Sequence, residues 1–135
     1  MKENSYLYEK IRKIDNDELR PLFHFTAPVG WINDPNGLIH YKNYYQLYYQ
    51  YNPYAPHWDN MHWGHARSKD GLHWEDMPIA MKPDHEYDKT GVFSGSAIEK
   101  DGKLYVLYTG HVDENDQITE TQCVALSDDG VDFKK

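Results

Sequence analysis

An internal repeat with a period of 59 residues is the feature that most constrains the fold of this chain. One ungapped shift places Ser68 on Ser127 and Gly71 on Gly130, so two Ser-x-Asp-Gly turns coincide. Other matched positions in the two copies are Ile39 with Ile98, Tyr49 with Tyr108, Ala66 with Ala125, Asp70 with Asp129 and Trp74 with Phe133. A fixed period of this length indicates a repeat architecture.

Each copy of the repeat reads as short strands joined by tight turns. Lys42-Asn43 separates two aromatic-rich runs in the first copy, and Lys100-Asp101-Gly102 takes that place in the second. Asp-Gly between apolar runs is a strong hairpin signal. The predicted strands are Gly37 to Tyr41, Tyr44 to Tyr51, Met61 to Ser68, Phe93 to Glu99, Lys103 to Thr109 and Thr121 to Ser127.

Repeated four-stranded units are the blades of a β-propeller. The sequence therefore predicts an all-β fold with roughly the first two blades of a propeller over residues 22–135. A helical segment, residues 1–21, precedes it: Ser5 is a plausible N-cap and Pro21 ends the helix. Two blades cannot close a ring, and an open blade leaves strand edges unpaired, so we expect the chain to be incomplete as a fold.

Composition narrows the function classes. The net charge is −8, which disfavours binding to nucleic acid, because neutralising the phosphates requires Lys and Arg. Aromatic residues make up 15% of the chain, which suits strands and also a carbohydrate site. Neither a signal-peptide core nor a membrane span is evident, and the single cysteine cannot form an intrachain disulfide. We therefore expect a cytoplasmic protein without a membrane partner; its oligomeric state is left open.

The segment Trp31-Ile32-Asn33-Asp34-Pro35-Asn36-Gly37 carries the clearest chemical signal. Pro35 favours an extended Asp34, and Pro35-Asn36-Gly37 predicts a tight turn before the first strand of a blade. A carboxylate beside amides suits a nucleophile, since hydrogen bonds to the charged form keep its pKa low. The alternative is an ordinary surface turn, although the apolar Trp31 and Ile32 argue against it.

Two further segments are candidates for a sugar site. Gln50 is a neutral donor and acceptor in an aromatic strand, and Trp58 lies in a loop where its ring can close over a ligand. Phe93 and Ser94 begin the strand that corresponds to the Asp34 segment in the second copy. The alternatives are a solvent-facing Gln50, a Trp58 that packs under its loop, and a closely packed Gly/Ser-rich strand start.

Metal and cofactor chemistry are not indicated. His57, His62 and His65 lack the converging spacing of a zinc site. No glycine-rich phosphate loop is present. We expect no metal and no cofactor.

Several of these motifs, in order, resemble glycoside hydrolase family 32, the invertase, β-fructofuranosidase and sucrose-6-phosphate hydrolase family. Trp-Ile-Asn-Asp-Pro-Asn-Gly is similar to the first family signature, and the resemblance covers the chain from about Leu22 to its C-terminus. The later matching motifs are Tyr-Gln-Tyr-Asn-Pro, Trp-Gly-His-Ala, Phe-Ser-Gly-Ser-Ala and Thr-Gln-Cys-Val-Ala.

The resemblance implies a five-bladed propeller, followed in full-length members by a β-sandwich. It implies retaining hydrolysis of terminal β-D-fructofuranosides, here sucrose or sucrose 6-phosphate, with Asp34 as the nucleophile. The substrate-binding residues by the same resemblance are Trp31, Asn33, Gln50, Trp58, Phe93 and Ser94.

The chain also departs from the family pattern. The Arg-Asp-Pro motif and the Glu-Cys motif, whose Glu is the family's general acid/base, do not occur in it. Three readings follow: part of an active fructoside hydrolase, a sugar-binding or inactive module, and a structural propeller without a sugar site. Another fructan hydrolase of the same family is a further alternative.

Overall fold

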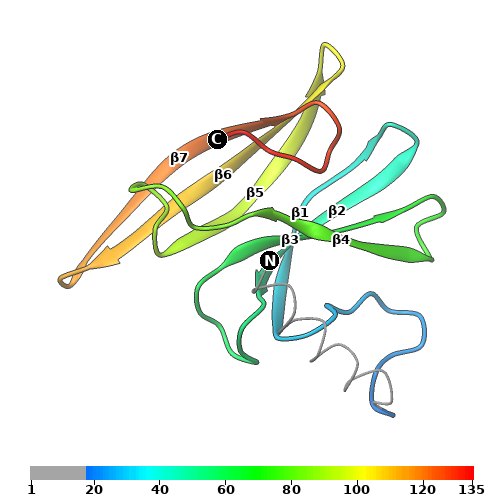
Figure 1. Ribbon diagram of the computed structural model, residues 1–135, viewed down its shortest axis with the longest axis horizontal. Helices are drawn as coiled ribbons and strands as arrows, with labels where there is room; N and C mark the ends of the chain where they lie inside the picture. The colour runs from blue at the N-terminus through cyan, green and yellow to red at the C-terminus, as the bar shows by residue number, and fades with distance from the viewer. Residues whose placement is uncertain (1–17) are drawn as a thin grey trace.

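A computed structural model describes residues 18–135, and this part of the chain is all-β, with seven strands in two antiparallel sheets (Figure 1). The predicted N-terminal helix lies almost wholly outside the described residues, so the division at residue 21 stays a prediction. Within the described residues, no helix has the length and apolar character needed to span a membrane.

The first sheet has the order β1-β2-β3-β4, and the second has the order β5-β6-β7. Strand β1 of the first sheet contacts β5 of the second, so the first strands of the two units lie side by side. The strands of the first sheet are β1 (Trp31–Tyr41), β2 (Tyr44–Asn52), β3 (His62–Ser68) and β4 (Trp74–Met81). Those of the second are β5 (Gly91–Lys100), β6 (Lys103–Glu114) and β7 (Gln117–Ser127).

The 59-residue repeat is a repeat of structure as well as of sequence. The hairpin turns of both copies carry two residues with positive φ: Lys42 (49°) and Asn43 (65°) in one, Asp101 (54°) and Gly102 (74°) in the other. Such residues form the turns whose twist matches antiparallel strands. Both hairpins predicted from the sequence are confirmed.

The repeat extends to the fourth strand of the second unit. In the first sheet, Arg67 of β3 pairs with Glu75 of β4. A β-bridge joins Leu126 to Lys134, the two positions 59 residues further along, and two backbone hydrogen bonds of 2.8 and 2.9 Å close it. The chain therefore contains one four-stranded blade and three strands of a second, together with the beginning of the fourth strand of that second blade, as the repeat predicts.

The Ser-x-Asp-Gly turns of the two copies share one hydrogen-bond pattern. Ser68 Oγ donates to Asp70 Oδ1 at 3.0 Å, and the N–H groups of Asp70 and Gly71 donate to Ser68 Oγ at 3.2 and 2.9 Å. Ser127 and Asp129 form the same three bonds at 2.9, 3.3 and 2.8 Å. Local side-chain bonds of this kind specify a turn independently of tertiary packing.

Two apolar layers cover the two faces of the first sheet. Adjacent residues of β2 alternate between them: Tyr48 belongs to the cluster shared with the second sheet, and Tyr49 belongs to the cluster on the opposite face. Because side chains alternate across a strand, a strand between two layers is apolar almost throughout. The shared cluster comprises Tyr41, Tyr48, Trp63, Met81, Val92, Leu104, Val106, Tyr108 and Ala125.

The prediction of a tight turn at Pro35-Asn36-Gly37 is wrong. These residues lie inside β1, where Pro35 pairs with Tyr49 and Asn36 pairs with Tyr48. β1 is the first strand of its sheet, and an edge strand tolerates a proline because one row of its N–H groups has no ladder partner. The turn-forming residues produce two shifts of register within the strand instead of a reversal of the chain.

Candidate active site

Asp34 and Ser94 meet where β1 approaches β5. Ser94 Oγ donates a hydrogen bond of 2.8 Å to Asp34 Oδ2, although the two residues are 60 positions apart. Oδ1 of Asp34 accepts no hydrogen bond among residues 18–135, and the side chain is exposed. One carboxylate oxygen is therefore held and the other is open to a ligand.

Both residues lie at a β-bulge. In β1 the pairing with β2 shifts by one residue between Ile32 and Pro35, which leaves Asn33 and Asp34 out of register. In β5 the pairing with β6 shifts between Phe93 and Gly95, which leaves Ser94 as the extra residue. A bulge re-aims a side chain and is common beside active sites. The equivalent irregularities turn an acid and a hydroxyl toward each other.

A buried amide network lies behind this pair. Gln50 Nε2 donates to the backbone oxygen of Val92 at 2.8 Å, and Trp63 Nε1 donates to that of Phe93 at 3.0 Å. The amide orientation that satisfies Asn36 places its oxygen 3.1 Å from Gln50 Nε2 and 3.2 Å from Trp63 Nε1. All three side chains are buried, so these bonds fix the start of β5 against the first sheet. Gln50 is not solvent-facing.

Two aromatic side chains among the candidate residues, Trp58 and Phe93, contact each other. The Trp58 ring meets the Phe93 ring edge-on, with centroids 5.9 Å apart and planes at 66°. Trp58 is 54% exposed, so it does not pack under its own loop. Phe93 is half-buried, and its ring stacks on His111 at 4.0 Å and 13°.

Trp31 and Asn33 form a local contact at the start of β1. The indole Nε1 donates to Asn33 Oδ1 at 2.9 Å. The amide nitrogen of Asn33 makes no side-chain hydrogen bond within the described chain. Because its oxygen is fixed by Trp31, that nitrogen presents a donor next to Asp34.

The buried tyrosines of β2, which are Tyr48, Tyr49 and Tyr51, stay neutral at physiological pH. Burial raises the pKa of Tyr51 to about 12, with the Asp76 charge adding to the effect. Burial also raises the pKa of Tyr49 well above its usual range. These three tyrosines therefore add no negative charge to β2 at physiological pH.

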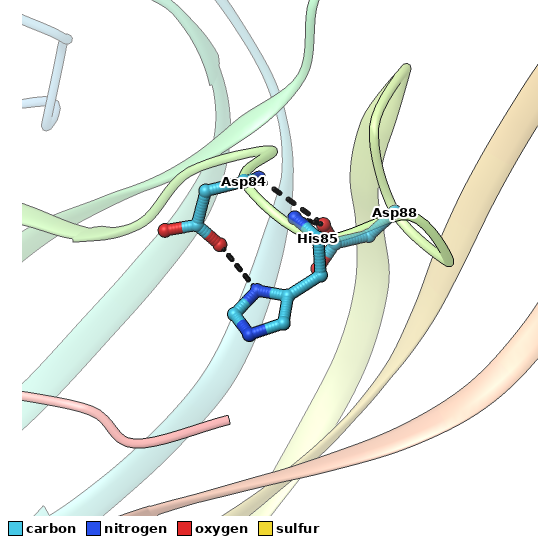
Figure 2. A group of neighbouring side chains, drawn as sticks. All are labelled: Asp84, His85 and Asp88. Atoms are coloured by element: carbon cyan, nitrogen blue, oxygen red, sulfur yellow. Dashed lines mark hydrogen bonds and ion pairs between the residues drawn. The ribbon is translucent and has the colours of Figure 1, made fainter.

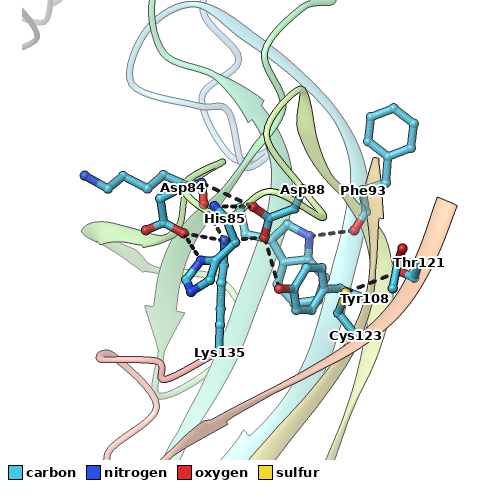
Figure 3. Close-up of polar contacts among 10 residues, drawn as sticks. Asp84, His85, Asp88, Phe93, Tyr108, Thr121, Cys123 and Lys135 are labelled. Atoms are coloured by element: carbon cyan, nitrogen blue, oxygen red, sulfur yellow. Dashed lines mark hydrogen bonds and ion pairs between the residues drawn. The ribbon is translucent and has the colours of Figure 1, made fainter. Parts of the chain in front are cut away.

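Within the described residues, one group of side chains has the spacing of a metal site: Asp84, His85 and Asp88 (Figure 2). Asp88 is fully buried, and its Oδ1 accepts the N–H of His85 at 2.9 Å. The Lys135 ammonium lies 2.9 Å from Asp84 Oδ1 and 2.6 Å from Asp88 Oδ2 (Figure 3). A lysine already supplies the positive charge, so these residues do not fit a cation site.

A cavity in the described chain lies apart from the candidate residues around Asp34 and Ser94. It has a volume of about 750 Å³ and lies along β3 and β4, lined by His65, Ile79, Met81 and Phe133 among others. None of the seven candidate site residues lines it. The chemistry gathers instead at the contact of β1 with β5.

Comparison with known proteins identifies the family. Residues 24–135 match the Glycosyl hydrolases family 32 N-terminal domain. The chain belongs to glycosyl hydrolase family 32. It is 48% identical over 128 residues to sucrose-6-phosphate hydrolase of Zymomonas mobilis, covering 92% of this chain and 25% of that protein.

Solved structures of family 32 proteins share the fold. Sucrose-6-phosphate hydrolase from Lactobacillus gasseri superposes with a TM-score of 0.90 at 31% identity, over 98% of this chain and 27% of that one. A Bombyx mori β-fructofuranosidase variant in complex with sucrose gives 0.85 at 40%, over 97% and 28%. The predicted all-β propeller fold is confirmed, and the chain spans about a quarter of the length of these family 32 relatives.

Sequence reasoning missed three residues of the site. Asn36 and Trp63 lie inside the family-like motifs, but nothing in the local sequence indicates that their side chains bond to each other. His111 carried no signal, because its contact with Phe93 depends on the register of β5 against β6.

Proposed function

We propose that the protein containing this chain hydrolyses terminal β-D-fructofuranosides with retention of configuration, with sucrose or sucrose 6-phosphate as substrate. Membership of family 32 and relatives named sucrose-6-phosphate hydrolase support this proposal. A structural relative in complex with sucrose supports a small fructoside ligand. A cytoplasmic location stays a prediction.

The observation that carries the proposal is the Ser94–Asp34 hydrogen bond. It holds one oxygen of an exposed carboxylate at 2.8 Å, on a bulge of β1. Retaining glycosidases need a carboxylate that attacks the sugar directly and is fixed in orientation. Asp34 is exposed and one of its oxygens is held by Ser94, which suits it to this role.

The reaction assigned to Asp34 is a double displacement. A carboxylate oxygen of Asp34 bonds to the anomeric carbon of the fructosyl unit as the bond to the glucosyl oxygen breaks, and a general acid protonates that oxygen. Water, deprotonated by the same group, then displaces Asp34 and releases fructose. Two inversions at one carbon retain the configuration.

The neighbouring residues are assigned to binding the fructosyl ring. Trp58 and Phe93 offer apolar rings, and Ser94 orients the nucleophile. Asn33 offers an amide donor that Trp31 fixes. Gln50 is buried and donates to Val92, so it acts at least in part by holding β5 in place.

The general acid/base is assigned to a part of the protein outside this chain, since the family's Glu-Cys motif does not occur in the sequence. On this assignment, the 135-residue chain alone binds a fructoside weakly and does not release glucose from sucrose. Glucose release by the purified chain, abolished by Asp34→Asn, would contradict it.

Labelling of the nucleophile tests the proposal directly. The longest natural form of the protein is treated with an activated fructosyl donor whose deglycosylation is slow, and its peptides are mapped by mass spectrometry. We expect one fructosyl adduct, on Asp34, and none in Asp34→Asn. Asp101→Asn is the matched control, because Asp101 lies in the turn after the far end of β5 and should leave labelling unchanged. An adduct on any other residue refutes the assignment.

A further inference from the structure

The orientation of the Phe93 ring is set by a contact outside the motifs. Its ring lies nearly parallel to the His111 imidazole, with centroids 4.0 Å apart and planes at 13°. Phe93 belongs to β5 and His111 to β6, yet they are not direct cross-strand partners: Phe93 pairs with Thr109, and His111 pairs with Gly91. The stack is therefore a diagonal one, within reach of aromatic side chains.

Gly91 makes the diagonal contact sterically possible. A Cβ at this position would lie 2.7 Å from Cε1 and 3.0 Å from Cδ1 of the Phe93 ring, closer than real contacts allow. The ring thus lies over a residue without a side chain and reaches the imidazole beyond it. Any larger residue at position 91 would push the ring off His111.

His111 itself is held by its backbone and its surroundings. Its carbonyl oxygen accepts the N–H of Thr90 at 3.1 Å and the Thr90 hydroxyl at 2.9 Å, and the residue is 8% exposed. Nδ1 lies 3.5 Å from Glu120 Oε1 and makes no hydrogen bond among the described residues. Besides this approach to Glu120, the imidazole stacks on the Phe93 ring.

We propose that His111 is a positioning residue of the fructosyl site: it supports one face of the Phe93 ring and so sets the surface that the sugar meets. The proposal rests on the function proposed above. The Trp58 ring contacts the Phe93 ring at a centroid distance of 5.9 Å, so a tilt of Phe93 would displace both rings. Since Nδ1 of the imidazole makes no hydrogen bond among the described residues, another flat ring should replace it and an aliphatic side chain should not.

The test compares kinetic constants of three variants in the longest natural form of the protein, with sucrose and sucrose 6-phosphate as substrates. His111→Phe keeps a flat ring, His111→Leu keeps apolar volume without one, and His111→Ala removes both. Stacking contributes in both ground and transition states, so KM rather than kcat should respond. We expect KM to rise about two- to tenfold in the Ala and Leu variants, the range set by aromatic pair energies, and to stay within twofold in the Phe variant.

The outcomes separate this inference from the function on which it rests. If Asp34→Asn keeps full turnover, the proposed function fails. If Asp34→Asn is inactive but His111→Leu has the KM of His111→Phe, the inference alone fails. Should His111→Ala not fold, the Leu and Phe variants still decide: unequal KM supports a flat support for Phe93, and equal KM overturns it.

Discussion

Acidification should destabilise this chain through one buried histidine. His65 of β3 is 1% exposed, and its Nε2 lies 2.8 Å from Gln46 Oε1. The amide nitrogen of Gln46 faces the Tyr41 carbonyl oxygen, so its oxygen faces the imidazole and Nε2 carries the proton. Nδ1 of His65 has no partner among the described residues. A second proton would therefore be placed on a buried nitrogen with no acceptor.

The size of the effect follows from the pKa of His65. Burial lowers this pKa from 6.5 to about 4, and the charge of Arg67 contributes in the same direction. The unfolded chain therefore binds the proton more tightly than the folded one. The resulting stability is fully present above pH 6.5 and is lost as the pH falls toward 4. At 1.36 kcal/mol per pKa unit, the loss reaches about 3 kcal/mol at pH 4.

Denaturant unfolding, followed by tryptophan fluorescence between pH 7.5 and 4.5, measures this loss. Relative to His65→Gln, the wild type should lose about 2.5 kcal/mol of its free energy of unfolding as the pH falls over this range, because glutamine does not titrate. His40→Gln is the matched control: His40 is exposed on β1, and its replacement should leave the pH dependence unchanged. Parallel curves for the wild type and His65→Gln would refute the reasoning.

Three further predictions concern the hairpin core, the turns and the site. Gly95→Ala should lower the free energy of unfolding in urea by more than about 2 kcal/mol, because its Cβ would lie 1.8 Å from a backbone oxygen, whereas Ser96→Ala next to it should be neutral. Ser68→Ala and Ser127→Ala should each cost about 1 kcal/mol in the same assay; clearly unequal losses would contradict the equivalence of the two turns. In a sucrose hydrolysis assay, Trp58→Ala should raise KM at unchanged melting temperature, since the side chain is 54% exposed. An unchanged KM would remove Trp58 from the site.

Local patterns were sufficient to predict most of the fold. The hairpins at Lys42-Asn43 and Asp101-Gly102 follow from Asn43, Asp101 and Gly102, which tolerate positive φ, and this preference does not depend on tertiary contacts. The Ser-x-Asp-Gly turns likewise form their own hydrogen bonds. The path of Asn33 to Asn36 could not be read locally, because the same residues favour a turn in isolation and a bulged edge strand once β2 pairs with them.

The site was predictable as a set of segments and not as a set of contacts. The 59-residue shift aligns Phe93 with Asp34, yet the residue that bonds Asp34 is Ser94. The one-residue offset comes from the bulges, which no strand periodicity reveals. The stack of Phe93 on His111 could not be predicted from the sequence for a related reason. A diagonal contact requires a particular register of β5 on β6 and a residue without a side chain at position 91.

The two blades share a β-bulge in the first strand, but each blade places a different side chain on it. Each first strand carries a bulge near its beginning, at Asn33-Asp34 in β1 and at Ser94 in β5. An irregularity kept in both copies belongs to the repeat, whereas the side chain placed on it is specific to each copy. The repeat thus supplies two re-aimed positions on neighbouring strands, and the difference between the copies, an acid in one and a hydroxyl in the other, creates the pair. This predicts that exchanging the two side chains, Asp34→Ser with Ser94→Asp, would preserve the hydrogen bond between the strands while removing the carboxylate from the position proposed for the nucleophile.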